Sequence, residues 1–463
     1  MTTGDTRTER DSMGEVAVPR EARWGASTQR AIENFRISGQ PVAPEILHAL
    51  AVLKAAAATS NASLGVLRPA VAAAIVSAAD EVSTGKYDAH FPVDRYQTGS
   101  GTSTNMNVNE VVANRASEMS GFDVHPNDHV NASQSSNDTF PTAIHLAVAL
   151  LLRDQAIPNL QGLEDALLVR SHEWHEIVKP GRTHLMDAAP ITLGQEFEGF
   201  AGQVRQSIDR IESAVPRLLE VPLGGTAVGT GLNAPAGFAE QTRQEIAART
   251  GIALAAPQSP MAAQSARDAL VEISASLRGA ALALMKICND LRWMNSGPHA
   301  GLAEIRLPAV QPGSSIMPGK VNPVIPEAVV QACCQVVGLD AAIVLGASTS
   351  AFQLNTAMPL MGCNVVEAVH LLASSAEALL HLVPSITADP AKLRQSAESS
   401  PAIATSLNLL VGYDAAASVV KAAEANGVTI RAAAQRLVDE GLVTADDLDI
   451  ALDVDRLARG GRD

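Results

Sequence analysis

Residues 311–327 read Gln-Pro-Gly-Ser-Ser-Ile-Met-Pro-Gly-Lys-Val-Asn-Pro-Val-Ile-Pro-Glu, and the rest of the chain is best interpreted outward from this stretch. Its first half contains two Pro-Gly pairs, which are disfavoured inside a helix or a central strand and therefore predict a loop with flexible ends. Between the pairs lie two hydroxyl groups, on Ser314 and Ser315. The ammonium group of Lys320 and the amide of Asn322 follow.

The second half of the stretch predicts the start of a helix. Pro326 suits the first turn of a helix, and Glu327 suits its positive end. The simplest alternative is a surface loop without a function. That alternative does not explain why two serines, a lysine and an asparagine are held between so many punctuating residues, so a catalytic loop is the favoured interpretation.

Three further stretches are rich in glycine and small polar residues: Gly99-Ser-Gly-Thr-Ser-Thr-Asn-Met-Asn107, Gln134-Ser-Ser-Asn-Asp138 and Gly181-Arg-Thr-His-Leu185. In the first, Thr102 or Ser103 is expected to cap a helix that runs to Met119, and a helix N-terminus with free N–H groups is a ready anion site. The second precedes Pro141, where a long apolar helix is expected to begin. A simple N-cap explains one of its polar residues but not all of them.

The composition favours a helical chain whose partner is neither nucleic acid nor a membrane. Of its 463 residues, 47% are hydrophobic but only 3% are aromatic, so the interior is built from small aliphatic side chains, which suits closely packed helices. The formal net charge of −15 argues against nucleic acid and anionic membrane surfaces. An anionic substrate would have to be attracted locally, by donors that converge in a cleft.

We expect no metal, no cofactor and no disulfide. The four cysteines show no C-x-x-C spacing, and the glycine-rich segment 221–233 lacks the known phosphate-binding patterns. A reduced cytoplasm fits best. The segment from Met1 to Gly14 is charged and polar, so neither a secretory signal nor a membrane anchor is expected there. Uninterrupted apolar runs are far shorter than the ~20 residues that a spanning helix needs.

Apolar residues at alternating steps of three and four predict long amphipathic helices in the middle of the chain. We expect such helices at 141–178, 197–218, 270–294, 326–346 and 363–385. The predicted fold is mainly all-α, with a mostly helical domain over 1–140, a central five-helix bundle over 141–390 and a small helical domain over 391–463. Small residues between Ala262 and Ala283 predict a second face on which another bundle packs.

The stretch G-S-S-x-M-P-x-K-x-N resembles the signature of the fumarase/aspartase superfamily, whose members release fumarate from succinyl-type substrates. The other three stretches match in the order of that family, so the resemblance covers nearly the whole chain. It implies a three-domain fold with a central long-helix bundle, no metal, and a homotetramer in which three subunits contribute to each site. It also implies a small dicarboxylate substrate, fumarate or malate.

The resemblance implies roles for individual residues. Ser314 removes the proton, with Lys320 and loop N–H groups stabilising its alkoxide, and His184 activates the water, oriented by Glu327. The residues implied in substrate binding are Ser100, Gly101, Thr102, Ser135, Ser136, Asn137, Thr183, Ser315 and Asn322.

A second dicarboxylate site in the family uses a segment similar to His125, Pro126, Asn127 and Asp128. Some members precede it with a basic residue, which residues 121–124 do not supply here, and the function of this second site therefore stays open.

Three positions favour the fumarase branch of the family over its aspartate ammonia-lyase branch: His184, Ser136 and Gly319. Residues 324–327 and 353–355 look slightly more like the aspartate branch, which is therefore kept as the alternative. Argininosuccinate and adenylosuccinate lyases are more distant. A catalytically idle relative is a further alternative, but it predicts the loss of a catalytic residue, and none is missing.

Overall fold

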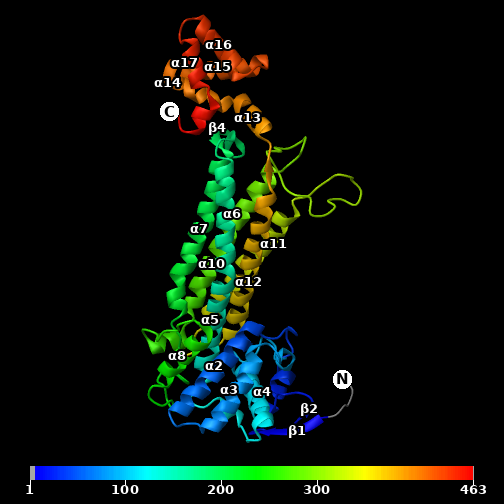
Figure 1. The fold of residues 1–463 in the computed structure, drawn as a ribbon, viewed down its shortest axis with the longest axis vertical. Coiled ribbons are helices and arrows are strands. Elements are labelled where there is room, and N and C mark those ends of the chain that lie inside the picture. Colours follow the sequence, from blue (N-terminus) through cyan, green and yellow to red (C-terminus); the bar gives the residue numbers. More distant parts are fainter. Residues whose placement is uncertain (1–5, 462–463) are drawn as a thin grey trace. The chain divides into compact units, whose positions relative to one another are not determined.

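The computed structural model describes residues 6–461, and the fold is mainly helical, as predicted (Figure 1). These residues form two compact units. The first unit comprises Met1–Pro158, Ser207–Leu282 and Ala332–Ser374, and the second comprises Asn159–Gln206, Ala283–Gln331 and Ser375–Asp463. The division into three domains at residues 140 and 390 stays a prediction.

The first unit contains two strands and a series of helices. These elements are β1 (Thr6–Asp11), β2 (Gly14–Pro19), α1 (Ala26–Asn34), α2 (Pro44–Ser63), α3 (Pro69–Ser83), η1 (Asp88–His90), α4 (Thr102–Ser120), η2 (Pro126–Val130), α5 (Ser136–Leu151), η3 (Leu152–Ala156), α8 (Phe238–Thr250) and α9 (Pro260–Ser265). The long helices with residues in the first, the second or both units are α6 (Ile157–Glu173), α7 (Leu193–Leu218), α10 (Asp268–Met294), α11 (Val324–Ala347) and α12 (Met358–Leu382).

The second unit adds two short sheets and the C-terminal helices. Its elements are β3 (Val178–Thr183), β4 (Met186–Thr192), β5 (Ile305–Arg306), η4 (Val383–Ser385), β6 (Thr387–Ala388), α13 (Pro390–Ser399), η5 (Pro401–Leu407), α14 (Asn408–Val411), α15 (Tyr413–Asn426), α16 (Ile430–Asp439), α17 (Ala445–Ala451) and α18 (Val454–Ala458).

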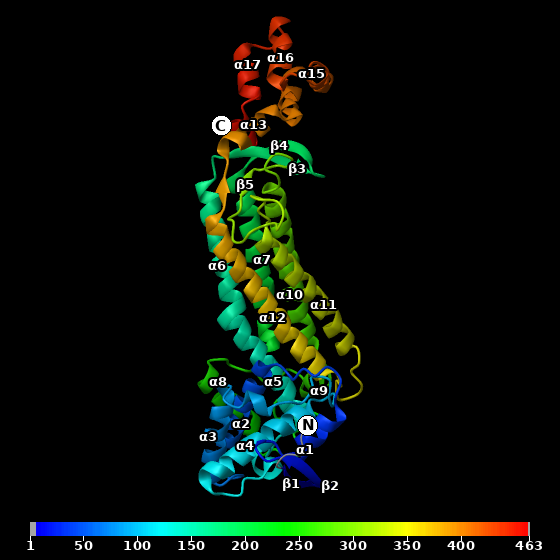
Figure 2. The same ribbon diagram turned by 90° about the vertical axis from the view of Figure 1, so that its right-hand side faces the viewer.

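Helices α2, α3 and α4 form the core of the first unit (Figures 1 and 2). Both α2 and α3 start with a proline at the first helical position, where its missing N–H costs nothing. The alanine-rich stretch 55–58 of α2 is buried, which lets the neighbouring helices approach closely. On α4, the carboxylate of Glu110 accepts from the N–H groups of Gly25, Ser27 and Thr28, and it therefore caps α1 from a distant part of the sequence.

The predicted apolar stripes of the long helices are confirmed. Along α10 every member of the stripe is buried, and along α7 all members are buried except Val215, which is partly exposed. The predicted second face was partly wrong. Ala262 and Ala263 lie in α9 rather than in a long helix, and Ala280 and Ala281 are already buried within the chain.

Helices α11 and Met358–Ser385 are, by length and composition alone, long and apolar enough to cross a membrane, a property that core helices of soluble proteins share. The apolar character of these two helices was not predicted, because only uninterrupted apolar runs in the sequence were compared with the length of a spanning helix. The two helices differ in burial. Of the most apolar 18-residue window, 56% is buried in Met358–Ser385 but only 33% in α11.

The antiparallel hairpin of β3 and β4 was not predicted, because its first strand contains a Pro-Gly pair that suggested a turn (Figure 2). The strand accommodates this pair with a bulge between Pro180 and Arg182. Residue pairing runs from Val178 with Thr192 to Thr183 with Met186, so the loop that joins the strands consists of His184 and Leu185.

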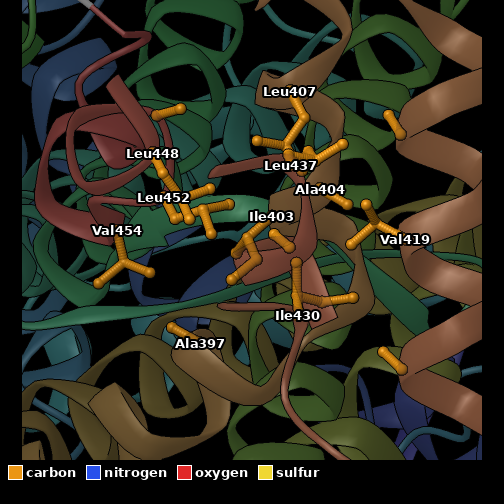
Figure 3. Packing of buried hydrophobic residues seen from close by; sticks show 14 of the residues in the cluster. Ala397, Ile403, Ala404, Leu407, Val419, Ile430, Leu437, Leu448, Leu452 and Val454 are labelled. Atoms are coloured by element: carbon orange, nitrogen blue, oxygen red, sulfur yellow. The ribbon is translucent and has the colours of Figure 1, made fainter. Parts of the chain in front are cut away.

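The C-terminal helices share a hydrophobic core of their own, in which leucine, isoleucine and valine side chains meet (Figure 3). Ile403, Leu407, Leu437, Leu448 and Leu452 are each no more than 3% exposed. The hairpin contacts this group through β3, which packs on α13, and through β4, which packs on α18. The C-terminal helices thereby support the strands that carry His184.

Candidate active site

The N-terminus of α4 is built by close approach of the backbone. A Cβ on Gly99 would lie 2.0 Å from the Thr356 carbonyl oxygen, and one on Gly101 would lie 2.3 Å from the Phe140 ring. Gly101 is the N-cap, with φ of 73°, and Thr102 is the first helical residue, so the predicted cap at Thr102 or Ser103 was wrong. Gly101 provides no side-chain cap, and Gln97 Oε1 accepts from the Thr104 N–H at 2.9 Å, so the N–H groups of Thr102 and Ser103 are the ones that stay available to an anion.

Helix α5 begins five residues earlier than predicted, at Ser136, and Pro141 lies inside it. Ser135 is the N-cap of a capping box in which its N–H donates to Asp138 Oδ1 at 2.9 Å. Ser136 and Asn137 are partly exposed on the first turn. The Asn137 side chain donates to the Ala227 carbonyl at 2.9 Å. The predicted substrate-binding residues therefore sit on a fixed helix start.

Asp138 joins this helix start to the glycine-rich loop that follows α7, a role that sequence reasoning missed. Its fully buried carboxylate accepts from Ser135 N–H with one oxygen and from Gly224 and Thr226 N–H, at 2.9 and 3.0 Å, with the other. Burial raises the pKa of Asp138 to about 6. Lys54 is also fully buried, and desolvation lowers its pKa to about 7.

Replacing Asp138 with asparagine is expected to lower the stability of the first unit by about 3 kcal/mol, because the amide keeps only one acceptor oxygen and must turn its NH2 group toward either the Ser135 N–H or the N–H groups of Gly224 and Thr226. The apparent melting temperature by calorimetry measures this loss. Asp447→Asn is the matched control, since Asp447 completes the same type of capping box on the exposed surface of α17. Equal shifts for the two variants would contradict the bridging role of Asp138.

The 311–323 loop folds back on itself. The Asn322 side chain donates to the Gly313 carbonyl at 2.8 Å, and Lys320 Nζ donates to Asn322 Oδ1 at 2.5 Å. Ser314 Oγ accepts from the N–H groups of Ile316 and Met317, at 3.2 and 3.0 Å. The loop thus aims two fixed donors at the Ser314 oxygen, as expected for a stabilised alkoxide, whereas Lys320 contacts Asn322 instead. Ser315 is exposed.

The end of the loop opens onto a cavity of about 880 Å³. Lys320, Asn322 and Glu327 line it together with two arginines, Arg292 and Arg306, that the sequence analysis did not single out. No motif surrounds these arginines, so the sequence offered no signal for them. Three cationic side chains around one cavity suit an anionic ligand in a chain whose net charge is strongly negative.

His184 and Thr183 lie at the exposed tip of the β3–β4 hairpin. The base of the hairpin is held by the buried Lys179, whose Nζ lies 2.9 Å from Glu304 Oε2, and by an ion pair between Arg182 and Glu304. Within the described chain the structure records no hydrogen bond between His184 and Glu327. The predicted pairing of these residues is therefore not formed inside a single chain.

Residues His125 to Asp128 form the start of η2, a single π-helical turn. His125 Nδ1 accepts from the N–H groups of Asn127 and Asp128 and acts as the N-cap of this turn. His125, Pro126 and Asn127 line a cavity of about 750 Å³ in the first unit. Of the two arginines that line it, Arg10 and Arg30, the second is paired with Asp11 at 2.8 Å.

Among residues 6–461, no group of three or more His, Cys, Asp or Glu side chains is placed to hold a metal ion. None of the four cysteines forms a disulfide in the structure: Cys334 is exposed, and Cys288, Cys333 and Cys363 are buried. Metal independence stays a prediction.

The chain matches two family models, described as "Lyase" over residues 14–338 and "Fumarase C C-terminus" over residues 403–459. The class II fumarate hydratase of Mycobacterium tuberculosis is 51% identical over 459 residues, covering 98% of this chain and 96% of that protein. The class II fumarate hydratase of Thermosynechococcus vestitus is 48% identical, covering 96% of this chain and 97% of that protein.

Solved structures agree with this assignment. The class II fumarase of Schistosoma mansoni is 35% identical, with a TM-score of 0.96 over 99% of this chain and 100% of that one. A fumarate lyase:delta crystallin of Brucella melitensis bound to cobalt is 45% identical, with a TM-score of 0.93 over 98% of this chain and 100% of that one. The chain is therefore a member of the lyase family that contains the class II fumarate hydratases.

Proposed function

We infer that the chain is a fumarate hydratase, which interconverts fumarate and (S)-malate by adding or removing water. The observation that carries this assignment is about 50% identity with class II fumarate hydratases over nearly the whole chain. His184, Ser136 and Gly319 support the same branch of the family. The geometry of the 311–323 loop fits the reaction, because it gives a serine oxygen two backbone donors.

The reaction requires a base that removes a weakly acidic proton beside a carboxylate. The intermediate carries a doubled charge on that carboxylate, which must be held by donors placed where the charge grows. The helix starts at Thr102 and Ser136 provide hydroxyl and backbone donors. Lys320 and Asn322 provide an ammonium and an amide beside the cavity. These groups stabilise a carboxylate without requiring a metal.

In the proposed mechanism Ser314 is the base and His184 activates water or protonates the leaving hydroxyl. A serine hydroxyl is a poor base unless its alkoxide is stabilised, and the N–H groups of Ile316 and Met317 supply that stabilisation. Glu327 orients the imidazole of His184. Closure of the Pro/Gly loop over the substrate excludes water and strengthens these interactions.

We further propose a homotetramer in which each site combines residues from three subunits. Two observations support it. His184 stands exposed at a hairpin tip without Glu327 as a partner in its own chain, so a residue from another subunit can complete its surroundings. Helix α11 is strongly apolar, yet most of its apolar window is unburied in one chain, and obligate interfaces of about 2,000 Å² or more cover such surfaces.

A fumarate hydratase of this kind fits the tricarboxylic acid cycle. We propose the cytoplasm as its location, because the cysteines of the chain form no disulfide.

The purified protein is expected to form fumarate from malate, seen as a rise in ultraviolet absorbance, and to form none from aspartate. Dialysis against a strong chelator is expected to leave the rate unchanged, and adding Co²⁺ or Mg²⁺ back should not raise it. Release of fumarate from aspartate but not from malate would place the chain in the ammonia-lyase branch. A metal-restorable loss of rate would overturn the proposed mechanism.

A further inference from the structure

We propose that Lys54 and Asn105 are positioning residues that hold the Ser136 hydroxyl with its proton directed at the substrate. The proposal rests on the proposed function, because it takes Ser136 to bind a substrate carboxylate. All of the residues involved lie in the first unit. Neither Lys54 nor Asn105 was expected to act in the reaction.

Lys54 lies on α2 and is fully buried beneath the segment that precedes α5. Its Nζ donates to Asn131 Oδ1 at 3.0 Å and to Gln134 Oε1 at 2.9 Å. An ammonium group only donates hydrogen bonds, so both amides must turn their oxygens toward it. Burial lowers the pKa of Lys54 to about 7. A neutral amine still has two N–H groups, which suffice for both contacts.

Backbone carbonyls fix the other ends of these amides. Gln134 Nε2 donates to the carbonyl oxygens of Val130 and Ala132, at 3.1 and 3.0 Å. Asn131 Nδ2 faces the carbonyl oxygen of Gln134 at 3.4 Å. Carbonyl oxygens only accept hydrogen bonds, so they require the NH2 group of each amide to face them. This leaves each amide oxygen facing Lys54, the same orientation that Lys54 requires. Neither amide can flip without placing two acceptors or two donors against each other.

Asn105 passes this orientation on to Ser136. Asn131 Oδ1, already turned toward Lys54, also accepts from Asn105 Nδ2 at 3.2 Å. The same Nδ2 donates to Ser136 Oγ at 3.0 Å. On its other side, Asn105 Oδ1 lies 3.3 Å from Thr139 Oγ1, whose single proton is shared with the closer Ser135 carbonyl at 2.8 Å. Asn105 is fully buried, so no water replaces these contacts.

The consequence is a defined polarity at Ser136. A serine hydroxyl can donate one hydrogen bond and accept others, so its direction depends on its neighbours. Here Ser136 Oγ accepts from Asn105, which leaves its proton free to donate. Ser136 is partly exposed on the first turn of α5, next to the helix N-terminus. A substrate carboxylate only accepts, so this orientation is the productive one.

Lys54→Met keeps an unbranched side chain, one atom shorter than lysine, but removes its hydrogen-bond donors. Asn131 is then held only by the long 3.4 Å contact with the Gln134 carbonyl, so we expect it to reverse together with Asn105, and the Ser136 proton to turn toward the Asn105 oxygen. We expect kcat/KM for malate to fall by about 10- to 100-fold, mainly through KM, which corresponds to the loss of one hydrogen bond to a charged group. Asn105→Asp, which replaces the donor with an acceptor of equal size, should have the same effect.

The decisive measurement is a double-mutant cycle with Ser136→Ala. If Lys54 and Asn105 act through the hydroxyl, Lys54→Met and Asn105→Asp should change kcat/KM by less than about 3-fold once Ser136 is alanine. Multiplicative losses in the double variants would overturn the proposal. Should Lys54→Met fail to fold, Asn105→Asp alone decides between the two outcomes.

Asn61 supplies the matched control. It lies on the same helix as Lys54, is equally buried, and supports the same segment through bonds to the Ala132 carbonyl at 3.0 Å and the Ser133 hydroxyl at 2.7 Å. Among the described residues the structure records no hydrogen bond from Asn61 to Asn131, Asn105 or Ser136, and Asn61 shares only the Ala132 carbonyl with Gln134, so any loss from Asn61→Ala should persist when Ser136 is alanine. If the wild-type protein did not turn over malate, the proposed function would be wrong. If it does turn over malate but the losses in the double variants are multiplicative, only the positioning role of Lys54 and Asn105 is wrong.

Discussion

Ser314→Ala is expected to lower kcat by about 10²- to 10⁴-fold while KM changes little. The reason is that a general base acts only as the transition state forms, so its loss spares substrate binding. In the structure Ser314 Oγ accepts two backbone N–H groups of its own loop, which would stabilise an alkoxide rather than hold a substrate. Steady-state kinetics with malate measures both constants. The neighbouring Ser315→Ala, at an exposed serine, is the matched control and should act mainly on KM.

Solvent exchange of the malate methylene proton in deuterated water distinguishes the roles of the two proposed catalytic groups. Ser314→Ala should abolish this exchange. His184→Asn should stop hydration yet retain exchange, because abstraction at the adjacent carbon precedes loss of hydroxide. The reverse result would show that the two roles have been assigned the wrong way round. A raised KM with kcat nearly intact in Ser314→Ala would reduce that residue to a substrate-binding group.

Mixing the inactive variants His184→Asn and Ser314→Ala should restore about a quarter of the wild-type activity after co-refolding. If the two residues of one site come from different subunits, random assembly of equal amounts gives both intact residues at one site in four. Each variant refolded alone is the control and should stay inactive. Complete absence of complementation, or full activity in a species that light scattering identifies as a monomer, would exclude sites shared between subunits.

Much of the helical fold could be predicted from local sequence, because helices carry their own signals. Helix α10 ends at Met294 as predicted, and its buried stripe follows the periodicity of three and four. The β3–β4 hairpin was not predicted, because it carries no local signal of a strand and depends on a distant part of the chain. Its first strand contains proline and glycine, and its stability comes from Glu304, which lies 125 residues after Lys179 in the chain.

The candidate site was predicted as motifs but not as a network. Lys54 stands in an alanine-rich helix, where a lysine usually lies on the solvent face, so nothing local indicated that it is buried. Asp138 was visible as part of a motif, but its partners Gly224 and Thr226 are more than 80 residues away. Such contacts depend on tertiary packing. The proposed pairing of His184 with Glu327 needs a further subunit, which one chain's sequence cannot place.

The two-residue loop at the tip of the hairpin carries a proposed catalytic residue in a backbone conformation that lowers the stability of the protein. His184 and Leu185 have φ of 58° and 61°, a left-handed backbone that Asn-Gly adopts readily and that costs other L-residues about 1–2 kcal/mol each. Laboratory selection for heat resistance alone would therefore favour Asn-Gly at this position and discard the imidazole with it. Selection for heat resistance and turnover together should keep His184 and raise stability through substitutions elsewhere in the chain. Variants from the two selections should therefore differ at positions 184 and 185.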